Sequence, residues 1–296
     1  MIASATSMEQ LKKKNDIPDL SKSFDSFQLH NITFTLPKGY IMGLIGPNGS
    51  GKTTTIKLIL NMLKRNSGEI KIMGLDNIID EQKAKAELGV VFDTNYFSDD
   101  WKITQVEKSI SVFYPNWNTE RFAEMLRKFH IATNKKVKEL SKGMQMKLML
   151  ACAFSYDAKL LILDEPTSGL DPVSRDELLQ ILSEYIEDGE HSVLFSTHIT
   201  GDLERAADYI TYISYGELFF SGSKDDFVDM FRIVKGGTKE LSPDLREKAV
   251  GVRTFPTGFE ALVKTEDTGA FSSLSIEPAT IDEIVVFTSK KGEDYE

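Results

Sequence analysis

The stretch GPNGSGKTT, residues 46–54, stands between an apolar run and a helical pattern. It matches G-x-x-x-x-G-K-[ST], with Gly46, Gly51, Lys52 and Thr53 at the defining positions. Glycines let the backbone fold closely around a phosphate chain, and the N–H groups that open the next helix then face the anion. A chance match in a glycine-rich turn is the alternative, but it leaves the flanking strand and helix unexplained. The stretch therefore predicts a nucleotide site, with binding residues Asn48, Gly49, Ser50, Gly51, Lys52, Thr53 and Thr54.

Strand and helix patterns alternate on both sides of this stretch. Short apolar runs are typical of strands that are covered on both faces of a sheet, whereas a period near 3.6 residues indicates helices. Their alternation predicts an α/β fold with a parallel core sheet and crossover helices. The expected strands are 28–36, 40–45, 67–74, 88–92, 159–164 and 191–196, and the expected helices are 52–64, 118–130, 141–155 and 172–187.

The character of the sequence changes near residue 221. A helical pattern at 242–250, alternating strand patterns within 252–265 and a last helix from about residue 280 follow this point. These short elements predict a small α+β appendage. The expected segments are an N-terminal extension at 1–17, a nucleotide-binding domain at 18–222 and a C-terminal accessory α+β region at 223–296.

Composition restricts the class of protein. A net charge of −10 disfavours a domain that grips nucleic acid. The longest apolar run, residues 148–154, is far shorter than the ~20 residues that a membrane-spanning helix needs. The N-terminus has no apolar segment typical of a signal peptide. A single cysteine, Cys152, argues against disulfides and favours a reducing compartment.

Two carboxylates follow the apolar run 159–164 in the stretch LLILDEPTSGLD, residues 160–171. In an open α/β sheet, ligands bind at the carboxyl ends of the strands. We therefore expect Asp164, together with the Thr53 hydroxyl, to hold Mg²⁺, and Glu165 to polarise a water molecule that attacks the γ-phosphate. The alternative is that Asp-Glu-Pro marks only a turn, but a phosphate loop in the same chain favours the catalytic interpretation.

His198 ends the expected strand 191–196 in the stretch STHIT. A lone histidine is more often an ordinary surface or core residue. This one, however, is expected at the same edge of the sheet as Glu165, where an imidazole can hydrogen-bond the γ-phosphate and position the attacking water. The predicted catalytic residues are therefore Glu165, His198 and Lys52.

Four motifs in a fixed order resemble the nucleotide-binding domain of ABC transporters: GPNGSGKTT (46–54), LSKGMQMK (140–147), LLILDEPTSGLD (160–171) and STHIT (196–200). The resemblance implies a P-loop ATPase that binds ATP and Mg²⁺, with antiparallel β and helical subdomains beside the parallel sheet. It also implies a head-to-tail dimer, as a homodimer or a heterodimer, with ATP between the two subunits. In such a dimer Ser141, Lys142 and Gly143 would bind the partner's ATP, with Gly143 leaving room for the phosphate. Asp171 would communicate across the dimer, and Phe24 would stack on adenine, unless it is only a core or edge residue.

Two departures from the family pattern stand out. The signature motif is usually LSGGQ, whereas this chain has Lys142 and Met144 in it. A glutamine that senses Mg²⁺ is replaced by Asp93, which would still bind the metal through a shorter, charged side chain. With the tail sequence, these departures resemble small bacterial ABC-2-type exporters, a group that includes YtrB-like proteins and exporters of bacteriocins and phenol-soluble modulins.

That resemblance implies an ATPase at the cytoplasmic face of the plasma membrane, peripheral to a separate transmembrane permease that docks at residues about 93–120. The expected cargo is amphipathic or antimicrobial peptides or drugs. Residues 93–107 are rich in aromatic and acidic side chains, as a docking surface is, although a solvated loop is the alternative. Two other functions stay open: a regulatory nucleotide switch with little turnover, and a soluble ABC ATPase that acts on nucleic acid or ribosomes.

Overall fold

The computed structural model of the chain describes residues 15–289. It divides them into two compact units, one formed by residues 15–198 and 205–221 and the other by 199–204 and 222–289. Most of the expected N-terminal extension lies outside the described residues, and strand β1 already begins at Asn15. The last residues of the expected accessory region, 290–296, also lie outside them.

The first unit is built on one mixed sheet with strand order β5-β4-β1-β2-β10-β9-β3-β8-β7-β6. Strands β9, β3, β8, β7 and β6 pair in parallel, and β1, β2, β4 and β5 pair with antiparallel neighbours. This arrangement confirms the predicted α/β class. The strands are β1 (Asn15–Ser23), β2 (Gln28–Leu36), β3 (Ile41–Ile45), β4 (Lys71–Ile72), β5 (Leu75–Asp76), β6 (Leu88–Val91), β7 (Leu160–Asp164), β8 (Ser192–Thr197), β9 (Tyr209–Ser214) and β10 (Glu217–Ser223).

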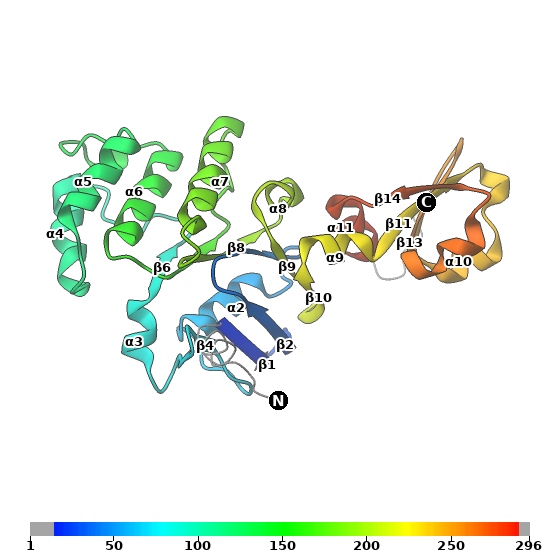
Figure 1. The fold of residues 1–296 in the computed structure, drawn as a ribbon, viewed down its shortest axis with the longest axis horizontal. Helices are drawn as coiled ribbons and strands as arrows, with labels where there is room; N and C mark the ends of the chain where they lie inside the picture. The colour runs from blue at the N-terminus through cyan, green and yellow to red at the C-terminus, as the bar shows by residue number, and fades with distance from the viewer. Residues whose placement is uncertain (1–14, 290–296) are drawn as a thin grey trace, which may run out of the picture. The chain divides into compact units, whose positions relative to one another are not determined.

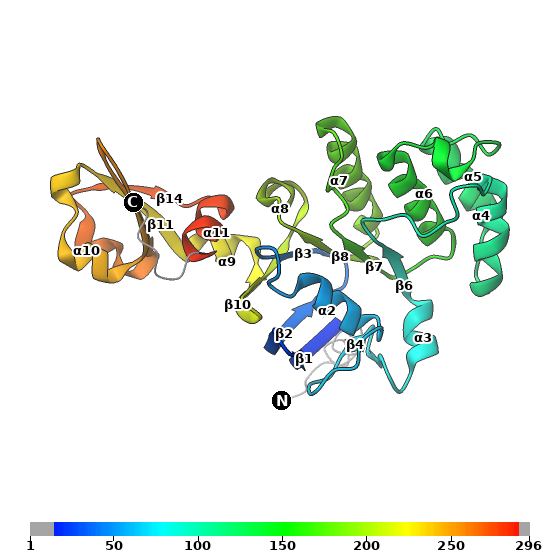
Figure 2. The same ribbon diagram turned by 180° about the vertical axis from the view of Figure 1, so that it is seen from behind.

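Helices cover this sheet and form a separate helical region. Ile56 and Ile59 of α2 are buried in one core with Leu20 and Ile32 of strands β1 and β2, and Figure 2 shows α2 beside these strands. Helices α4, α5 and α6 gather beyond β6 (Figure 1). The helices are α2 (Lys52–Ile59), α3 (Glu81–Ala86), α4 (Ile103–Ile110), α5 (Thr119–Lys128), α6 (Lys142–Ser155), α7 (Pro172–Ile186) and α8 (Thr200–Ala206).

Two local predictions were wrong in detail. The expected strand 67–74 contains only the two-residue strand β4 (Lys71–Ile72). Helix α2 ends at Ile59 instead of residue 64, because Asn61 takes a left-handed φ of 52° that a continuing helix does not allow. Within the stretch 93–107, Phe97 and Ile103 are buried and helix α4 begins at Ile103, so only part of the stretch is exposed, and its role in docking stays a prediction.

The second unit contains a four-stranded antiparallel sheet of order β12-β13-β11-β14. Helix α10 joins β11 to β12, and the short helix η4 joins β13 to β14. A β-α-β-β-α-β chain with this strand order has the ferredoxin-like topology, which confirms the α+β class. The elements are α9 (Lys224–Asp229), β11 (Phe231–Gly236), α10 (Pro243–Lys248), β12 (Ala249–Phe255), β13 (Gly258–Lys264), η4 (Thr265–Phe271), β14 (Ser275–Pro278) and α11 (Ile281–Ser289).

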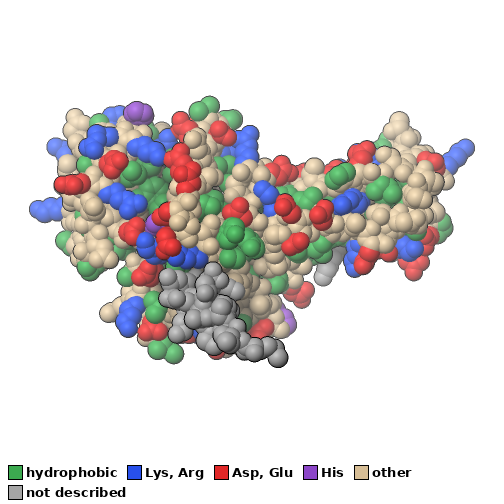
Figure 3. All heavy atoms as spheres, viewed as in Figure 1, with side chains coloured by type: hydrophobic (Ala, Val, Ile, Leu, Met, Phe, Trp, Pro, Cys, Tyr) green, Lys and Arg blue, Asp and Glu red, His purple; other side chains and the backbone are tan. Residues whose placement is uncertain are grey.

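The surface of the described residues bears on the class of partner. Acidic and basic side chains are interspersed on the face that Figure 3 shows. Among residues 15–289, none of the helices has the length and apolar character needed to cross a bilayer.

Candidate functional site

The phosphate loop lies between the end of β3 and the start of α2. A side chain at Gly46 would place its Cβ atom 2.0 Å from the Ile213 carbonyl oxygen, so only glycine fits there. Gly51 has a φ of 113° and caps α2 without a side-chain hydrogen bond, and the first turn of the helix carries no acidic residue. The N–H groups of that turn are therefore left facing outward with an uncompensated positive helix end, which favours an anion.

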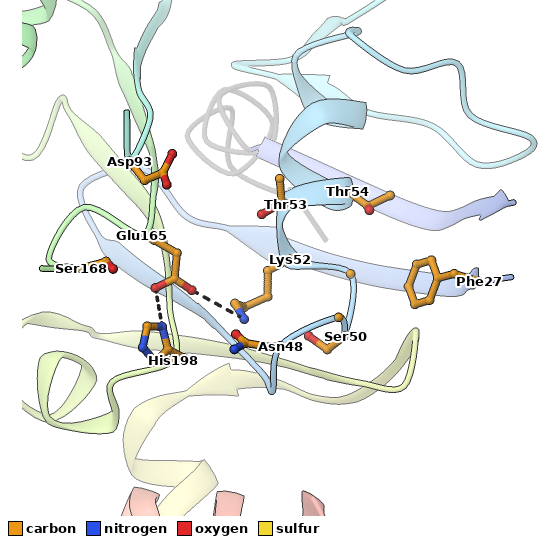
Figure 4. Close-up of a pocket in the computed structure, with 12 residues that line it drawn as sticks. Phe27, Asn48, Ser50, Lys52, Thr53, Thr54, Asp93, Glu165, Ser168 and His198 are labelled. Carbon is orange, nitrogen blue, oxygen red and sulfur yellow. Dashed lines mark hydrogen bonds and ion pairs between the residues drawn. The ribbon is translucent and has the colours of Figure 1, made fainter. Parts of the chain in front are cut away.

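A cavity of about 510 Å³ opens over this loop. It brings together residues that the sequence places far apart, and the predicted catalytic residues lie in it (Figure 4). The lining consists of residues 48–54, Phe27, Asp93, Glu165, Ser168 and His198. Phe27 and Ser168 are lining residues that sequence reasoning missed.

Lys52 is buried at the floor of the cavity, with 6% of its surface exposed. Its Nζ atom donates a hydrogen bond of 2.8 Å to the Gly46 carbonyl and lies 3.6 Å from Oε1 of Glu165. Burial lowers the pKa of Lys52 because it penalises the charged form, while the carboxylates of Glu165 and Asp164 oppose this shift. An arriving polyanion would supply further negative charge and hold the ammonium in its charged form.

Asp164 ends strand β7 beside the phosphate loop. The Thr53 hydroxyl donates to its two carboxylate oxygens at 3.2 and 3.0 Å, and the Ser196 hydroxyl, from strand β8, donates at 2.6 Å. Hydroxyl and carboxylate oxygens are the ligands that Mg²⁺ prefers. Thr53 and Asp164 thus fit the predicted metal role. Ser196, the first residue of the stretch STHIT, is a supporting residue to which the sequence analysis gave no role.

The carboxylate of Glu165 contacts His198 through one oxygen and Lys52 through the other. Its Oε2 atom lies 2.7 Å from Nδ1 of His198, and the opposite oxygen faces Lys52 (Figure 4). The backbone of Glu165 takes a left-handed φ of 50°, which is uncommon for a non-glycine residue, and its N–H donates to the Ser196 hydroxyl at 2.9 Å. Strained backbone of this kind clusters at functional sites, where the surroundings fix one orientation of the side chain.

A buried hydroxyl in the loop indicates space for a ligand. Oγ of Ser50 is buried and has no hydrogen-bond partner among the described residues. A buried polar atom without a partner is costly, and a phosphate oxygen in the cavity would satisfy it. The loop therefore fits a nucleotide phosphate chain.

The aromatic residue of the cavity differs from the expected one. Phe27 lines the cavity and packs on the loop, since a Cβ atom at Gly51 would lie 3.1 Å from its ring. Phe24 is 42% exposed and is not among the lining residues, and its ring faces the Lys22 ammonium at 5.3 Å. Phe27 is therefore the aromatic residue of the cavity lining, and the stacking of Phe24 on adenine stays a prediction.

Comparisons with known proteins agree with this geometry. Residues 29–168 match the family model described as ABC transporter. The chain is 32% identical over 204 residues to the ABC transporter ATP-binding protein YtrB of Bacillus subtilis (strain 168), covering 69% of this chain and 70% of that protein. This chain belongs to the ATP-binding subunits of ABC transporters. Members of this family bind ATP, couple its hydrolysis to transport and work with membrane permease subunits, so the chain is an ATPase component of such a complex.

Two further relatives support the assignment. The Nod factor export ATP-binding protein I of Rhizobium leguminosarum bv. viciae is 30% identical, with 79% of each chain covered. A solved ATP-binding subunit of an ABC transporter superposes with a TM-score of 0.66 at 28% identity, covering 72% of this chain and 90% of that one.

The signature residues of this ABC subunit lie away from the cavity. Ser141 is the N-cap of α6, and its Oγ accepts a hydrogen bond of 3.3 Å from the Met144 N–H. A Cβ atom at Gly143 would lie 3.4 Å from Oγ of Ser174, an ordinary van der Waals distance, so packing within the chain does not by itself require glycine here. The expectation that Gly143 leaves room for a partner's phosphate stays a prediction.

Lys142 and Asp171 flank the same surface. The Lys142 side chain lies against Gly169: a Cβ atom added at Gly169 would be 3.2 Å from Nζ of Lys142. Asp171 caps α7 by accepting hydrogen bonds from the Ser174 hydroxyl at 2.6 Å and from two backbone N–H groups. These bonds, the Ser174 hydroxyl first among them, hold the pKa of Asp171 below its ordinary value. Asp171 thus has a structural role in addition to any role toward a second subunit.

The choice between the two phenylalanines gives a prediction. Phe27→Ala is expected to weaken ATP binding about fivefold, since an aromatic stack contributes roughly 1 kcal/mol, whereas Phe24→Ala should stay within about twofold. Titration with a fluorescent nucleotide measures both. A larger loss in Phe24→Ala than in Phe27→Ala would restore the original assignment of Phe24.

Proposed function

We propose that this ABC subunit powers an exporter. Two copies, or two related subunits, bind ATP between them in a head-to-tail dimer. A separate permease holds the chain at the cytoplasmic face of the plasma membrane. The contact of Glu165 with both Lys52 and His198 over the phosphate loop carries the catalytic part of this proposal. The export direction is supported by a relative that is named for Nod factor export. We place the cargo among amphipathic or antimicrobial peptides or drugs.

Hydrolysis would use the residues of the cavity in distinct roles. Glu165 accepts a proton from the attacking water, whose oxygen bonds to the γ-phosphorus as the bond to the bridging oxygen of ADP breaks. His198 orients the Glu165 carboxylate through the 2.7 Å contact. Lys52 turns from Glu165 to the phosphates and offsets their charge. Mg²⁺, held by Thr53 and Asp164 with Asp93 at the cavity wall, would supply additional charge neutralisation when bound.

The second half of the site would come from another subunit. Ser141 and Lys142 stand at the N-terminal end of the 14-residue helix α6, whose first turn has no acidic residue. Lys142 is exposed. A cation is unfavourable at the positive end of a helix, and the γ-phosphate of a partner's ATP would offset this cost. Asp171, at the start of α7, would contact the same partner.

The composite site can be tested at Ser141. In a Glu165→Gln background, Ser141→Arg is expected to leave ATP binding within about twofold and to abolish ATP-dependent dimers, because the longer side chain occupies the place of the partner's phosphate. Ser242→Arg is the matched control, since Ser242 is likewise an N-cap serine, of α10. Dimers are measured by light scattering with and without ATP. Dimers that persist in Ser141→Arg would contradict the head-to-tail arrangement.

A groove in the helical region is suited to the permease. It has a volume of about 470 Å³ and is lined by Lys85, Phe113, Tyr114 and Tyr156 among others. Val112 and Phe113 are 75% and 76% exposed beside it, although they are large apolar residues. Such exposure marks an interaction site. We place a cytoplasmic helix of the permease here, where residues 113–116 of the expected docking region 93–120 meet Lys85 and Tyr156.

Reconstitution with a membrane partner tests the function as a whole. ATP turnover should rise when the permease that co-purifies with the chain is added, and it should not change with RNA or DNA. Turnover that responds to nucleic acid would favour the soluble alternative. A rate that stays near background with and without the permease would favour the regulatory switch.

Asp93 gives a further prediction about the metal. Asp93 lines the cavity opposite the phosphate loop. Asp93→Gln removes one negative charge near the metal. It should therefore shift either the Mg²⁺ concentration for half-maximal turnover or the stimulation by the permease by about threefold, while the affinity for ATP stays constant. Mg²⁺ titrations of turnover measure the effect, and Asp99→Gln is a control at a nearby carboxylate outside the lining. No change in either property would make Asp93 a bystander.

A further inference from the structure

The boundary between the two units falls inside the catalytic region. The first unit ends at His198, and the next six residues, 199–204, belong by their contacts to the unit that contains the ferredoxin-like sheet. The chain then returns to the first unit at Arg205. A residue that contacts Glu165 is thus joined directly, through one peptide bond, to a segment that the accessory unit holds.

Two hydrogen bonds link this segment to the rest of the accessory unit. The Thr200 hydroxyl donates to Oδ1 of Asp282 at 2.9 Å, and Nζ of Lys224 donates to the Glu204 carbonyl at 3.0 Å. Glu204 and Lys224 also line a hollow of about 490 Å³ together with Ile281, the residue before Asp282.

Asp282 projects from a helix that is firmly seated. Ile281, Ile284 and Phe287 of α11 are buried. A Cβ atom at Gly251 of β12 would lie 3.0 Å from the Phe287 ring, so this helix packs closely on the sheet. Gly251 pairs with Leu262, and successive residues of a strand face opposite sides. Helix α11 therefore covers the face opposite to the core that contains Ala261 and Val263.

We propose that Asp282 is a positioning residue for the ATPase reaction: by holding Thr200, it fixes the segment that follows His198 and so keeps the imidazole against Glu165. The hydrogen bond has a charged acceptor, which makes it stronger than a neutral one. Thr200 stands two residues after His198, so loss of this bond frees the backbone that orients the imidazole. The accessory unit is thereby coupled to turnover. This inference rests on the proposed role of His198.

Steady-state kinetics on the full chain test the inference. Asp282→Ala and Thr200→Val should each lower kcat about fivefold without changing the KM for ATP, and the double variant should lose no more than either single one. Asp282→Asn, which keeps an acceptor oxygen, should retain most of the rate. Asp244→Asn is the matched control, since Asp244 is an exposed acid of the same unit that pairs with Lys248. The melting temperature should be the same in all variants.

A His198→Ala background separates this inference from the proposed function. If His198→Ala lowers kcat and Asp282→Ala adds nothing to it, Asp282 acts through His198. Two results would overturn the positioning role while the role of His198 stands. In the first, His198→Ala is impaired but Asp282→Ala and Thr200→Val turn over at the wild-type rate. In the second, the kcat losses of His198→Ala and Asp282→Ala multiply in the double variant. A wild-type rate in His198→Ala overturns both.

Discussion

Glu165→Gln is expected to lower ATP turnover about a hundredfold, the usual contribution of a general base, while ATP binding persists. The substitution keeps the size of the side chain and its left-handed backbone, so the cavity keeps its shape. It removes the charge that accepts the proton of the attacking water, and it weakens the contact with His198. Phosphate release under single-turnover conditions measures the chemical step separately from product release.

Glu184→Gln is the matched control for this experiment. Glu184 also faces a lysine, with Oε2 at 2.6 Å from Nζ of Lys128, but the pair lies on the surface. Exposed ion pairs contribute little, so this variant should turn over at the wild-type rate. Turnover in Glu165→Gln that equals the control would remove Glu165 from the catalytic role.

The local motifs could be predicted from the sequence because each depends on a short stretch of chain. The phosphate loop needs only its glycines, Lys52 and the adjoining strand and helix. The end of strand β7 follows from an apolar run that stops at Asp164. Parallel neighbours then place Asp164 and His198 at the same edge, because both follow strands of one sheet.

Features that depend on tertiary contact could not be predicted in this way. Phe24 and Phe27 are three residues apart, and only the fold decides which ring lines the cavity. Ser196 sits within a strand and becomes important because β8 pairs with β7 in a register that sets it opposite Asp164. Residues 199–204 belong to the accessory unit because of contacts with a helix some eighty residues later in the chain, and no local sequence pattern reveals such contacts.

Lys52→Met is expected to weaken ATP binding about a hundredfold. Lys52 is the one lysine or arginine among the residues that line the cavity, and hydrogen bonds to charged groups contribute roughly 2–3 kcal/mol when buried. Methionine keeps much of the length of the side chain, so packing at the floor of the cavity is preserved while the charge is lost. Isothermal titration with ATP and with ADP measures the change.

The same variant separates charge from backbone in the phosphate loop. ADP lacks the γ-phosphate, so its affinity should fall less than that of ATP if Lys52 acts on the terminal phosphates, whereas equal losses would mean that the loop itself is disturbed. Lys64→Met is the control, because Lys64 is an exposed lysine beyond the end of α2. ATP binding within about twofold of wild type in Lys52→Met would show that the N–H groups of the loop and the α2 helix end supply most of the affinity, and the buried ammonium would then serve the reaction instead of binding.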